Sequence, residues 1–477
     1  MTSIINNILK DGNGNEHQIK SPGSGELLGK IKYGDANDVN EAVQAASHAT
    51  KEFSTLSIFE RTEILVNIAG KIQEKRMSIA ELLSKEHGKP LYTEALGEVD
   101  SCITSFRDAA SQMNSITDEI IPLRDSTKRA FAYRKPRGVY AVITPWNFPI
   151  GNACTYYIAP GLAAGNTIVW TPAPSCPNTA QALMECVIEA GMPEGALNLV
   201  IGEGPVVGDT AVTHELTNAI GFTGSTKTGE IIAQRSGIKP CLLELGGNGP
   251  SIVMQDANIN QAAKAIAAGS FVNAGQVCTS TERVLVHDSV ADELIESLQG
   301  EIKSIVLGDP LDKNTTMGPV HNDDTVKKIM THIRDAVDKG ARLVTGGSID
   351  DQFPTSLYVK PTLIDRVSKS ALINTEETFG PVIGLVRYKT EFELDEIINS
   401  SPYRLSGSIF SEDIRHSMLL AEKLNFGFIN INEASNYWEP QVPAGGASGS
   451  PSGYDRSGGK ASIENMSETQ TIVVNMQ

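Results

Sequence analysis

The chain has 477 residues, more than one compact domain usually holds, and this length predicts roughly two to four domains. Its hydrophobic fraction of 40% and charged fraction of 20% are those of an ordinary globular protein. With 40 basic against 57 acidic residues the net charge is -17, which argues against nucleic acid as a partner because a phosphate backbone requires an excess of Lys and Arg.

The predicted elements begin with helices and change character after residue 137. Apolar residues at helical spacing predict packing helices in three stretches: 38–53, 57–87 and about 92–113. From Gly138, short β-branched runs alternate with helical patterns, and a second alternating set follows from about Ser251. Alternation at this pace is typical of βαβ units and parallel sheets. The sequence therefore predicts two consecutive α/β domains, with a boundary near residues 246–250.

Two expected strands fall outside this alternation. Residues 116–137 are polar and strand-like, and residues 468–475 form another strand with no helix after it. Unpaired strands invite addition, so these two would pair with each other or with another chain. We interpret them as a sign of oligomerisation.

Residues 443–459 hold six glycines, four serines and two prolines in 17 residues. Such a composition is typical of a flexible linker. An apparent strand follows instead of a new domain, so an ordered glycine-rich loop beside a functional site is an equal alternative.

The six cysteines indicate neither a disulfide framework nor a metal site. They are few for so long a chain, and no two stand at CxxC spacing. No two histidines have the i, i+4 spacing of a zinc-binding helix. We expect no metal, reduced thiols and a cytoplasmic location.

No export or membrane signal is expected either. The N-terminal segment lacks a basic stretch followed by an apolar one, so it does not read as a signal peptide. The apolar runs stay well short of the roughly 20 residues that span a bilayer. We expect no membrane partner.

Two glycine-containing turns could bind phosphate at the edge of the first sheet, where a dinucleotide site is expected. The triplet Gly202, Gly204 and Gly208 departs by one residue from the GxGxxG spacing. The turn at residues 222–229 is better placed, because Ser225 can cap a helix whose free N–H groups attract an anion. An ordinary capped helix is the alternative.

Three polar residues on loops between elements could carry chemistry. Cys278 lies on a glycine-containing loop, Glu244 ends an apolar strand, and Asn147 follows another strand in a turn fixed by two prolines. Each also has a plain structural interpretation: a buried thiol, a solvated strand-end carboxylate and a locally bonded amide. No GxSxG sequence is present, so the common serine-hydrolase motif is absent.

Six motifs together are more specific than any of these residues alone. In chain order they are TPWNFP, FTGST, ELGGN, GQVCTS, ETFGP and the closing glycine-rich stretch. Their order and spacing closely resemble the aldehyde dehydrogenase superfamily, over essentially the whole chain. The resemblance implies an α/β fold of two doubly wound parallel-sheet domains, one Rossmann-like and one catalytic, with a small β oligomerisation element.

The implied domain limits follow the predicted elements. Residues 1–115 and 138–246 would form the cofactor-binding domain, residues 247–445 the catalytic domain, and residues 116–137 and 460–477 the oligomerisation strands. A homodimer or homotetramer is expected.

The resemblance also assigns roles in aldehyde oxidation. Cys278 would add to the aldehyde as a thiolate, and Asn147 with the backbone N–H of Cys278 would hold the oxyanion. Hydride transfer to the nicotinamide would leave a thioester that Glu244 hydrolyses by activating water. Glu244 precedes Cys278 by 34 residues (278 − 244), the separation expected of this pair. Its presence favours hydrolysis over transfer to coenzyme A.

The resemblance implies a set of cofactor contacts in the first half of the chain and around ETFGP. These are Ile143, Thr144, Pro145, Trp146, Thr171, Ala173, Pro174, Gly204, Phe222, Gly224, Ser225, Leu245, Gly246, Glu377 and Phe379. Relatives usually carry Lys-Pro-x-Glu where this chain has Thr171-Pro-Ala-Pro174. The missing glutamate would no longer repel a 2′-phosphate, and the missing lysine would no longer attract one. We expect NAD or NADP to serve, with NAD slightly favoured.

The implied substrate pocket is small and polar. Its expected residues are Asn152, Thr155, Val277, Thr279, Tyr437 and Ala444. Tyr437 would form an aromatic wall, and the other positions favour a small polar or anionic aldehyde, unless the volume is filled from elsewhere. The alternatives to a dehydrogenase are a silent structural or binding member of the family and a thiol esterase or acyltransferase.

Overall fold

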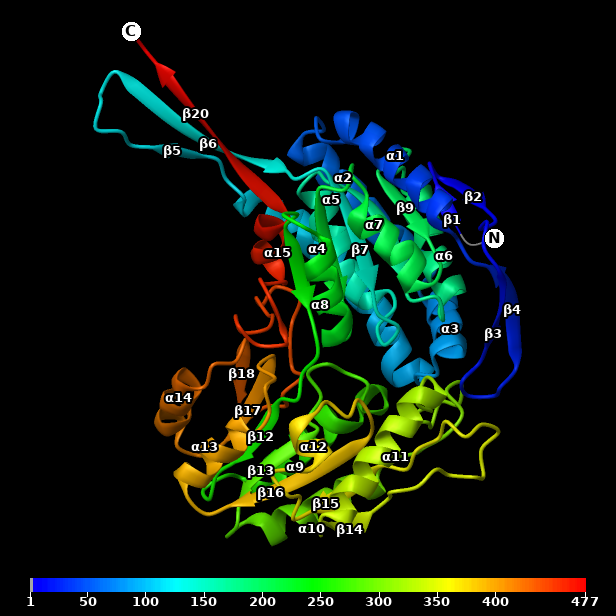
Figure 1. The fold of residues 1–477 in the computed structure, drawn as a ribbon, viewed down its shortest axis with the longest axis vertical. Coiled ribbons are helices and arrows are strands. Elements are labelled where there is room, and N and C mark those ends of the chain that lie inside the picture. The colour runs from blue at the N-terminus through cyan, green and yellow to red at the C-terminus, as the bar shows by residue number, and fades with distance from the viewer. Residues whose placement is uncertain (1–2) are drawn as a thin grey trace.

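The structure is a computed structural model that describes residues 3–477, and it contains two large, mostly parallel sheets (Figure 1). The first sheet has the strand order β19-β11-β10-β7-β8-β9-β1-β2. Its strands are β19 (Gly453–Tyr454), β11 (Cys241–Glu244), β10 (Ala219–Thr223), β7 (Val139–Thr144), β8 (Thr167–Pro172), β9 (Leu197–Val200), β1 (Ser3–Ile5) and β2 (Ile8–Lys10). The five central strands, from β11 to β9, run parallel to one another.

The second sheet has the order β14-β15-β16-β13-β12-β17-β18. Its strands are β14 (Arg342–Thr345), β15 (Thr362–Asp365), β16 (Val382–Tyr388), β13 (Arg283–His287), β12 (Pro250–Val253), β17 (Ser406–Phe410) and β18 (Phe428–Ile431). Only the edge strand β14 is antiparallel to its neighbour. The α/β fold class expected from the sequence is confirmed.

Helices cover both sheets. Those around the first sheet are α1 (Ala36–Phe53), α2 (Ile58–Glu74), α3 (Arg76–His87), α4 (Leu96–Gln112), α5 (Ala159–Ala163), α6 (Pro177–Glu189), α7 (Asp209–Thr213), α8 (Thr226–Arg235) and α15 (Gly459–Asn465). Those around the second are α9 (Ile259–Phe271), α10 (Ala291–Lys303), α11 (Asp323–Asp338), α12 (Leu372–Thr375), α13 (Glu391–Asn399) and α14 (Ile414–Lys423). Among the described residues, none of these helices combines the length and the apolar character needed to cross a membrane.

Strand β7 shows why the first sheet is buried on both faces. Tyr140 and Val142 belong to one apolar core, and Val139 and Ala141 to another. Successive side chains of a strand point to opposite faces, so these two cores lie on the two sides of the sheet. The rigid layer that results fixes where each strand ends.

A smaller sheet projects from the body of the protein and carries the C-terminus at its tip (Figure 1). It has the order β20-β6-β5, formed by β20 (Ser467–Asn475), β6 (Lys128–Pro136) and β5 (Glu119–Ile121). Strand β20 pairs antiparallel with β6 along its full length. The two isolated strands thus pair within the chain. An exposed apolar row remains that includes Ile120 and Ile472, which both lie level with Phe131 of β6.

The long helical pattern at residues 57–87 is divided in two. Helix α2 ends before Lys75, whose backbone angles of φ -101° and ψ 12° are not helical, and α3 starts after it. The Lys75 side chain pairs with Glu189 and Glu185, which belong to α6. A tertiary ion pair of this kind cannot be read from helical spacing. A separate hairpin of β3 (Glu16–Lys20) and β4 (Leu27–Lys32) lies outside both large sheets.

Candidate active site

Two cavities meet at Cys278. The larger, of about 310 Å³, is lined by Cys278 together with Glu244, and the smaller, of about 210 Å³, by Cys278 together with Asn147. Glu244 ends β11 and Asn147 follows β7, so both stand at the carboxyl edge of the first parallel sheet, where α/β proteins place functional groups. The three predicted catalytic residues therefore border one continuous site.

The loop that carries Cys278 is shaped by an unusual backbone. After α9, Asn273, Ala274 and Gly275 have φ angles of 53°, 52° and 72°, in the left-handed region. A side chain at Gly275 would lie 2.1 Å from the carbonyl oxygen of Gly380, so only glycine fits there. The turn directs the chain back toward the first sheet. Gly247 passes so close that its Cβ would be 2.0 Å from the Cys278 carbonyl oxygen.

Asn147 is held from several directions. Its Nδ2 donates to the carbonyl oxygen of Gln276 at 2.9 Å. Its own carbonyl oxygen accepts from Lys89 Nζ at 3.0 Å and from Asn273 Nδ2 at 2.9 Å. The second amide hydrogen of Asn147 has no acceptor among residues 3–477, which leaves a fixed donor for an oxygen that forms beside Cys278.

Glu244 is buried, with 6% of its surface exposed. Burial raises the pKa of its carboxyl group to about 8, while a hydrogen bond from Ser457 and the charge of Arg456 act to lower it. Ser457 Oγ donates to Glu244 Oε1 at 2.7 Å. A carboxylate whose pKa lies near the working pH is suited to take a proton from water.

The thiol of Cys278 is not ionised at neutral pH by its surroundings alone. Burial, and then the charges of Glu377 and Glu244, raise its pKa to about 12. The thiolate is the nucleophilic form, so the thiol must lose its proton during the reaction. Cys278 is nevertheless partly exposed, whereas the other five cysteines are buried.

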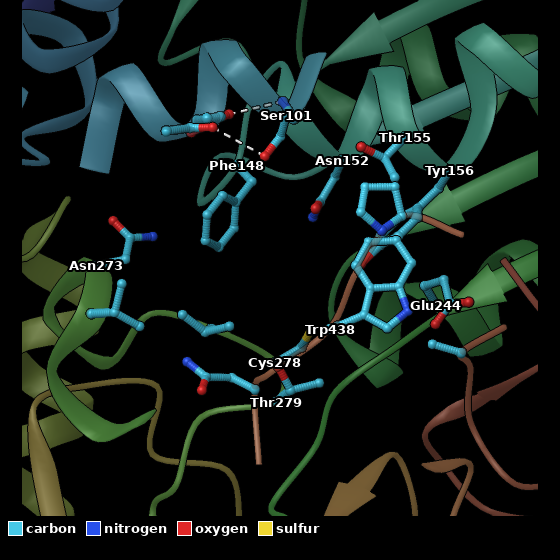
Figure 2. A pocket seen from close by; sticks show the side chains of 18 of the residues that line it. Ser101, Phe148, Asn152, Thr155, Tyr156, Glu244, Asn273, Cys278, Thr279 and Trp438 are labelled. Carbon is cyan, nitrogen blue, oxygen red and sulfur yellow. Dashed lines mark hydrogen bonds between the residues drawn. The ribbon is translucent and has the colours of Figure 1, made fainter. Parts of the chain in front are cut away.

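The larger cavity has polar and aromatic walls (Figure 2). The predicted substrate residues that line it are Asn152, Thr155, Val277, Thr279 and Ala444. Tyr437 does not line it: its side chain is 52% exposed and its hydroxyl donates to Glu439. The neighbouring Trp438 faces the cavity instead, held by a hydrogen bond from Nε1 to the carbonyl oxygen of Val442. The sequence predicted an aromatic wall from this loop, but the ring that lines the cavity is Trp438 and not Tyr437.

The smaller cavity is lined by many of the predicted cofactor contacts. These are Pro145, Trp146, Gly224, Ser225, Leu245, Gly246, Glu377 and Phe379. The predicted contacts that do not line it are Ile143, Thr144, Thr171, Ala173, Pro174, Gly204 and Phe222. Gly204 begins a helical turn, Gly204–Gly208, outside this cavity.

Besides Thr223 of the FTGST motif, two lining residues of the smaller cavity were not predicted from the sequence, Thr325 and Lys328. Both belong to α11, which Asn322 caps with its side chain. Their spacing of three residues places them on one face of that helix. No local signal in the sequence shows that this face of α11 meets the carboxyl edge of the first sheet.

The smaller cavity offers groups that suit a phosphate and a ribose. It opens onto the N-terminus of α8, where Ser225 Oγ accepts from the backbone N–H of Thr228 at 3.3 Å and the helix dipole favours negative charge. Lys328 adds a cation. Glu377 offers a carboxylate for ribose hydroxyls, with its Oε1 accepting from the backbone N–H of Gly247 at 3.0 Å.

A buried carboxylate that sequence reasoning missed fixes the aromatic end of this cavity. Glu282 accepts hydrogen bonds from the backbone N–H groups of Thr378 and Phe379. Phe379 has a φ angle of 62°, so these bonds hold a strained backbone in place. Its ring contacts Trp146 edge to face at 5.6 Å between centroids. Among the described residues no cluster of side chains suits a metal ion.

Comparison with known proteins gives consistent matches along the whole chain. The sequence profile of the Aldehyde dehydrogenase family matches residues 9–472. The chain is 37% identical to lactaldehyde dehydrogenase of Methanocaldococcus jannaschii, over 97% of this chain and 98% of that protein. It is 34% identical to the NADP(+) succinate-semialdehyde dehydrogenase of Escherichia coli, over 99% of this chain and 98% of that protein.

A solved structure also matches this chain over its whole length. A point mutant of betaine aldehyde dehydrogenase from Staphylococcus aureus, in complex with NAD+, has a TM-score of 0.95 and 31% identity. The match covers 100% of this chain and 97% of that chain.

Proposed function

Since the chain belongs to the aldehyde dehydrogenase family, we propose that it oxidises small polar aldehydes to carboxylic acids with NAD or NADP, using Cys278, Asn147 and Glu244. The observation that carries this assignment is the place of Cys278, at the junction of two cavities of which one is bordered by Asn147 and the other by Glu244. A nucleophile in that place can reach an aldehyde from one side and a hydride acceptor from the other.

The first step makes the aldehyde carbon tetrahedral. The ionised sulfur of Cys278 forms a C–S bond to it, and the electron pair of the carbonyl π bond moves to the oxygen. The free Nδ2 hydrogen of Asn147 and the backbone N–H of Cys278 stabilise that oxyanion. When bound, NAD or NADP supplies the two-electron acceptor for the hydride that leaves this carbon, so the adduct becomes a thioester.

The second step releases the acid and regenerates the ionised sulfur of Cys278. Glu244 removes a proton from water, the water oxygen bonds to the acyl carbon, and the C–S bond breaks with its electron pair returning to Cys278. The balance is one aldehyde, one water and one oxidised cofactor converted to one acid, one reduced cofactor and one released proton. Burial raises the pKa of Glu244 to about 8, close to the working pH, as this role requires.

The test is the absorbance of reduced cofactor with a panel of aldehydes. We expect Cys278→Ala to abolish the signal and Glu244→Gln to lower the steady-state rate by about 100-fold or more, while one equivalent of reduced cofactor still forms rapidly. Turnover that survives in Cys278→Ala would refute the assignment. Ester hydrolysis without cofactor reduction would favour a thiol esterase, and no reaction with any aldehyde would favour a silent family member.

The named substrates of the three relatives differ in charge. Lactaldehyde is neutral, succinate semialdehyde carries a carboxylate and betaine aldehyde carries a quaternary ammonium group. The identities lie between 31% and 37%, so overall similarity does not select among these charges. The charge that the substrate can carry must therefore be inferred from the residues that line the larger cavity.

We also propose a homodimer or homotetramer assembled through the projecting sheet. The support is the exposed apolar row on β5 and β20, where Ile120 is 70% and Ile472 45% exposed on the same face of the sheet. A cytoplasmic location is supported by six cysteines that are all free thiols. Light scattering on the purified protein, and on Ile472→Lys, tests the assembly: the variant should have a lower molar mass in solution than the unmodified protein.

A further inference from the structure

One wall of the larger cavity carries two buried acceptor oxygens with nothing to accept. Glu94 Oε2 and Asn273 Oδ1 are both buried, and neither has a hydrogen-bond partner among the described residues. Both residues line the cavity that also holds Cys278. Buried polar atoms are nearly always paired, so two unpaired acceptors in one cavity indicate a ligand that donates.

The orientation of both groups is fixed. Glu94 Oε1 accepts from the backbone N–H of Asn273 at 3.0 Å, which holds the two residues side by side. The Nδ2 of Asn273 donates to the carbonyl oxygens of Asn147 and Gln276, at 2.9 Å and 3.2 Å. The amide cannot exchange its nitrogen and oxygen without losing both bonds, so its Oδ1 remains an acceptor.

This wall is well placed for the far end of a short substrate. In the view of Figure 2, Asn273 lies on one side of the cavity and Glu244 and Trp438 on the other, with Cys278 between them. An aldehyde carbon at Cys278 can therefore extend a substituent toward Asn273 and Glu94 and leave the opposite side to Glu244 and its water.

The acidic and basic side chains that line the cavity are all carboxylic acids. Glu94, Glu98 and Glu244 line it, and no Lys or Arg of the described chain does so. The buried Lys89 forms an ion pair with Glu98 at 2.5 Å and donates to the Asn147 carbonyl oxygen. Its charge is therefore neutralised by Glu98 and is not available to a substrate anion. Burial is the main reason that the pKa of Glu94 is raised to about 7, so desolvation in this wall disfavours a negative charge.

We propose that the enzyme selects short aldehydes with a hydrogen-bond donor at the far end, a hydroxyl or an ammonium group, and rejects aldehydes with a carboxylate or sulfonate there. Glu94 and Asn273 are the specificity residues. The inference rests on the proposed function, since it concerns the substrate of the same site. A donor would pair both acceptors, whereas an anion would be desolvated beside Glu94 with no unpaired Lys or Arg in the cavity lining.

The wild-type enzyme tests this with four three-carbon aldehydes, and needs no variant. We expect 3-hydroxypropanal and 3-aminopropanal to exceed propanal in kcat/KM by about tenfold or more, and 3-oxopropanoate to fall below propanal by about tenfold or more. A kcat/KM for 3-oxopropanoate equal to or above that of propanal overturns the proposal. If none of the four reduces cofactor, the proposed function falls and this inference with it, whereas oxidation of propanal without a donor preference removes this inference alone.

Glu94→Gln tests the residue. The amide keeps the size of the side chain, removes its charge and adds a donor. Relative to propanal measured with the same variant, we expect kcat/KM for 3-aminopropanal to fall by about tenfold and that for 3-oxopropanoate to rise severalfold. Glu293→Gln, the same change on the exposed face of α10, is the matched control and should leave all four values unchanged. Equal effects of Glu94→Gln on the four aldehydes would contradict a role in specificity.

Discussion

Ser457 donates a hydrogen bond of 2.7 Å to Oε1 of Glu244, across 213 positions of the sequence. Ser457 belongs to the glycine-rich stretch, and its backbone exchanges two hydrogen bonds with that of Ala444. The stretch is therefore an ordered loop beside the site, the second of the two interpretations of its composition. The hydroxyl stabilises the ionised form of the carboxyl group that burial opposes.

The first prediction concerns this hydrogen bond. In Ser457→Ala the pKa of Glu244 should rise above its value of about 8, because the ionised form loses its donor. A hydrogen bond to a charged group contributes about 1.5 kcal/mol, or about one pH unit. The rate of thioester hydrolysis rises as Glu244 loses its proton, so its pH profile should move by about one unit to higher pH.

The measurement is the pH dependence of steady-state turnover after the first equivalent of reduced cofactor. Ser450→Ala is the matched control, because Ser450 lies in the same loop and donates to the carbonyl oxygen of Ala447 instead. Ser457→Thr should restore the original profile. An unchanged profile in Ser457→Ala would show that Ser457 does not control the base.

The second prediction concerns the buried ion pair behind Asn147. Lys89 Nζ lies 2.5 Å from Glu98 Oε2 and also donates to the Asn147 carbonyl oxygen, while Glu98 Oε1 accepts from the backbone N–H groups of Ile150 and Gly151. The pair thus holds both ends of the loop that presents the Asn147 amide. Removing one partner should cost about 3–5 kcal/mol of unfolding free energy, since the other charge stays buried alone.

Lys89→Met, Glu98→Gln and the double variant give the measurement. We expect the double variant to lose less unfolding free energy than the two single losses added together. In all three, kcat should fall by about tenfold while the dissociation constant of NAD stays the same, because the amide is misplaced and the cofactor cavity is not. Additive losses, or a weaker hold on NAD with normal kcat, would contradict the positioning role.

The sequence predicted those site residues whose positions depend on the local course of the chain. Asn147 and Glu244 follow buried strands, and the parallel pairing of β7, β10 and β11 brings their ends to one edge, as βαβ alternation predicts. The motif order identified the family, which the comparisons confirm. The pairing of the two isolated strands was one of two options left open.

The residues that were missed act through contacts between distant segments. Glu282 holds Phe379 and Glu94 holds the Asn273 backbone, at separations of 97 and 179 positions. Periodicity reports the face on which a residue lies and not what that face meets. Tyr437 illustrates the limit within one loop, because a difference of one residue decided which ring entered the cavity.

The third prediction concerns the choice of cofactor. The family resemblance implies that the adenine ribose of the cofactor lies beside Thr171 and Pro174. Neither residue carries a charge, so that position has no carboxylate to repel a 2′-phosphate and no ammonium group to attract one. We expect kcat/KM for NAD and NADP to lie within about tenfold of each other, with NAD ahead. Pro174 is partly exposed, and Pro174→Glu should raise the NAD preference by about tenfold through repulsion of the phosphate. Pro174→Gln is the uncharged control. A strong preference of the unmodified enzyme for either cofactor would refute the expectation.

The fourth prediction concerns the reactivity of the nucleophile without cofactor. Burial and the charges of Glu377 and Glu244 raise the pKa of Cys278 to about 12, so the thiolate fraction at pH 7 is very small. Alkylation by iodoacetamide should be slow and should accelerate by about tenfold for each pH unit below that pKa. Removing the Glu377 charge lowers the thiol pKa, so Glu377→Gln should react faster than wild type at every pH from 7 to 10. Cys278→Ser should lose this pH-dependent labelling, because the other five cysteines are buried. A rate that is already independent of pH between 7 and 9 would mean that the thiol is ionised in the free enzyme, and the activating group would then have to be sought among the donors around Cys278.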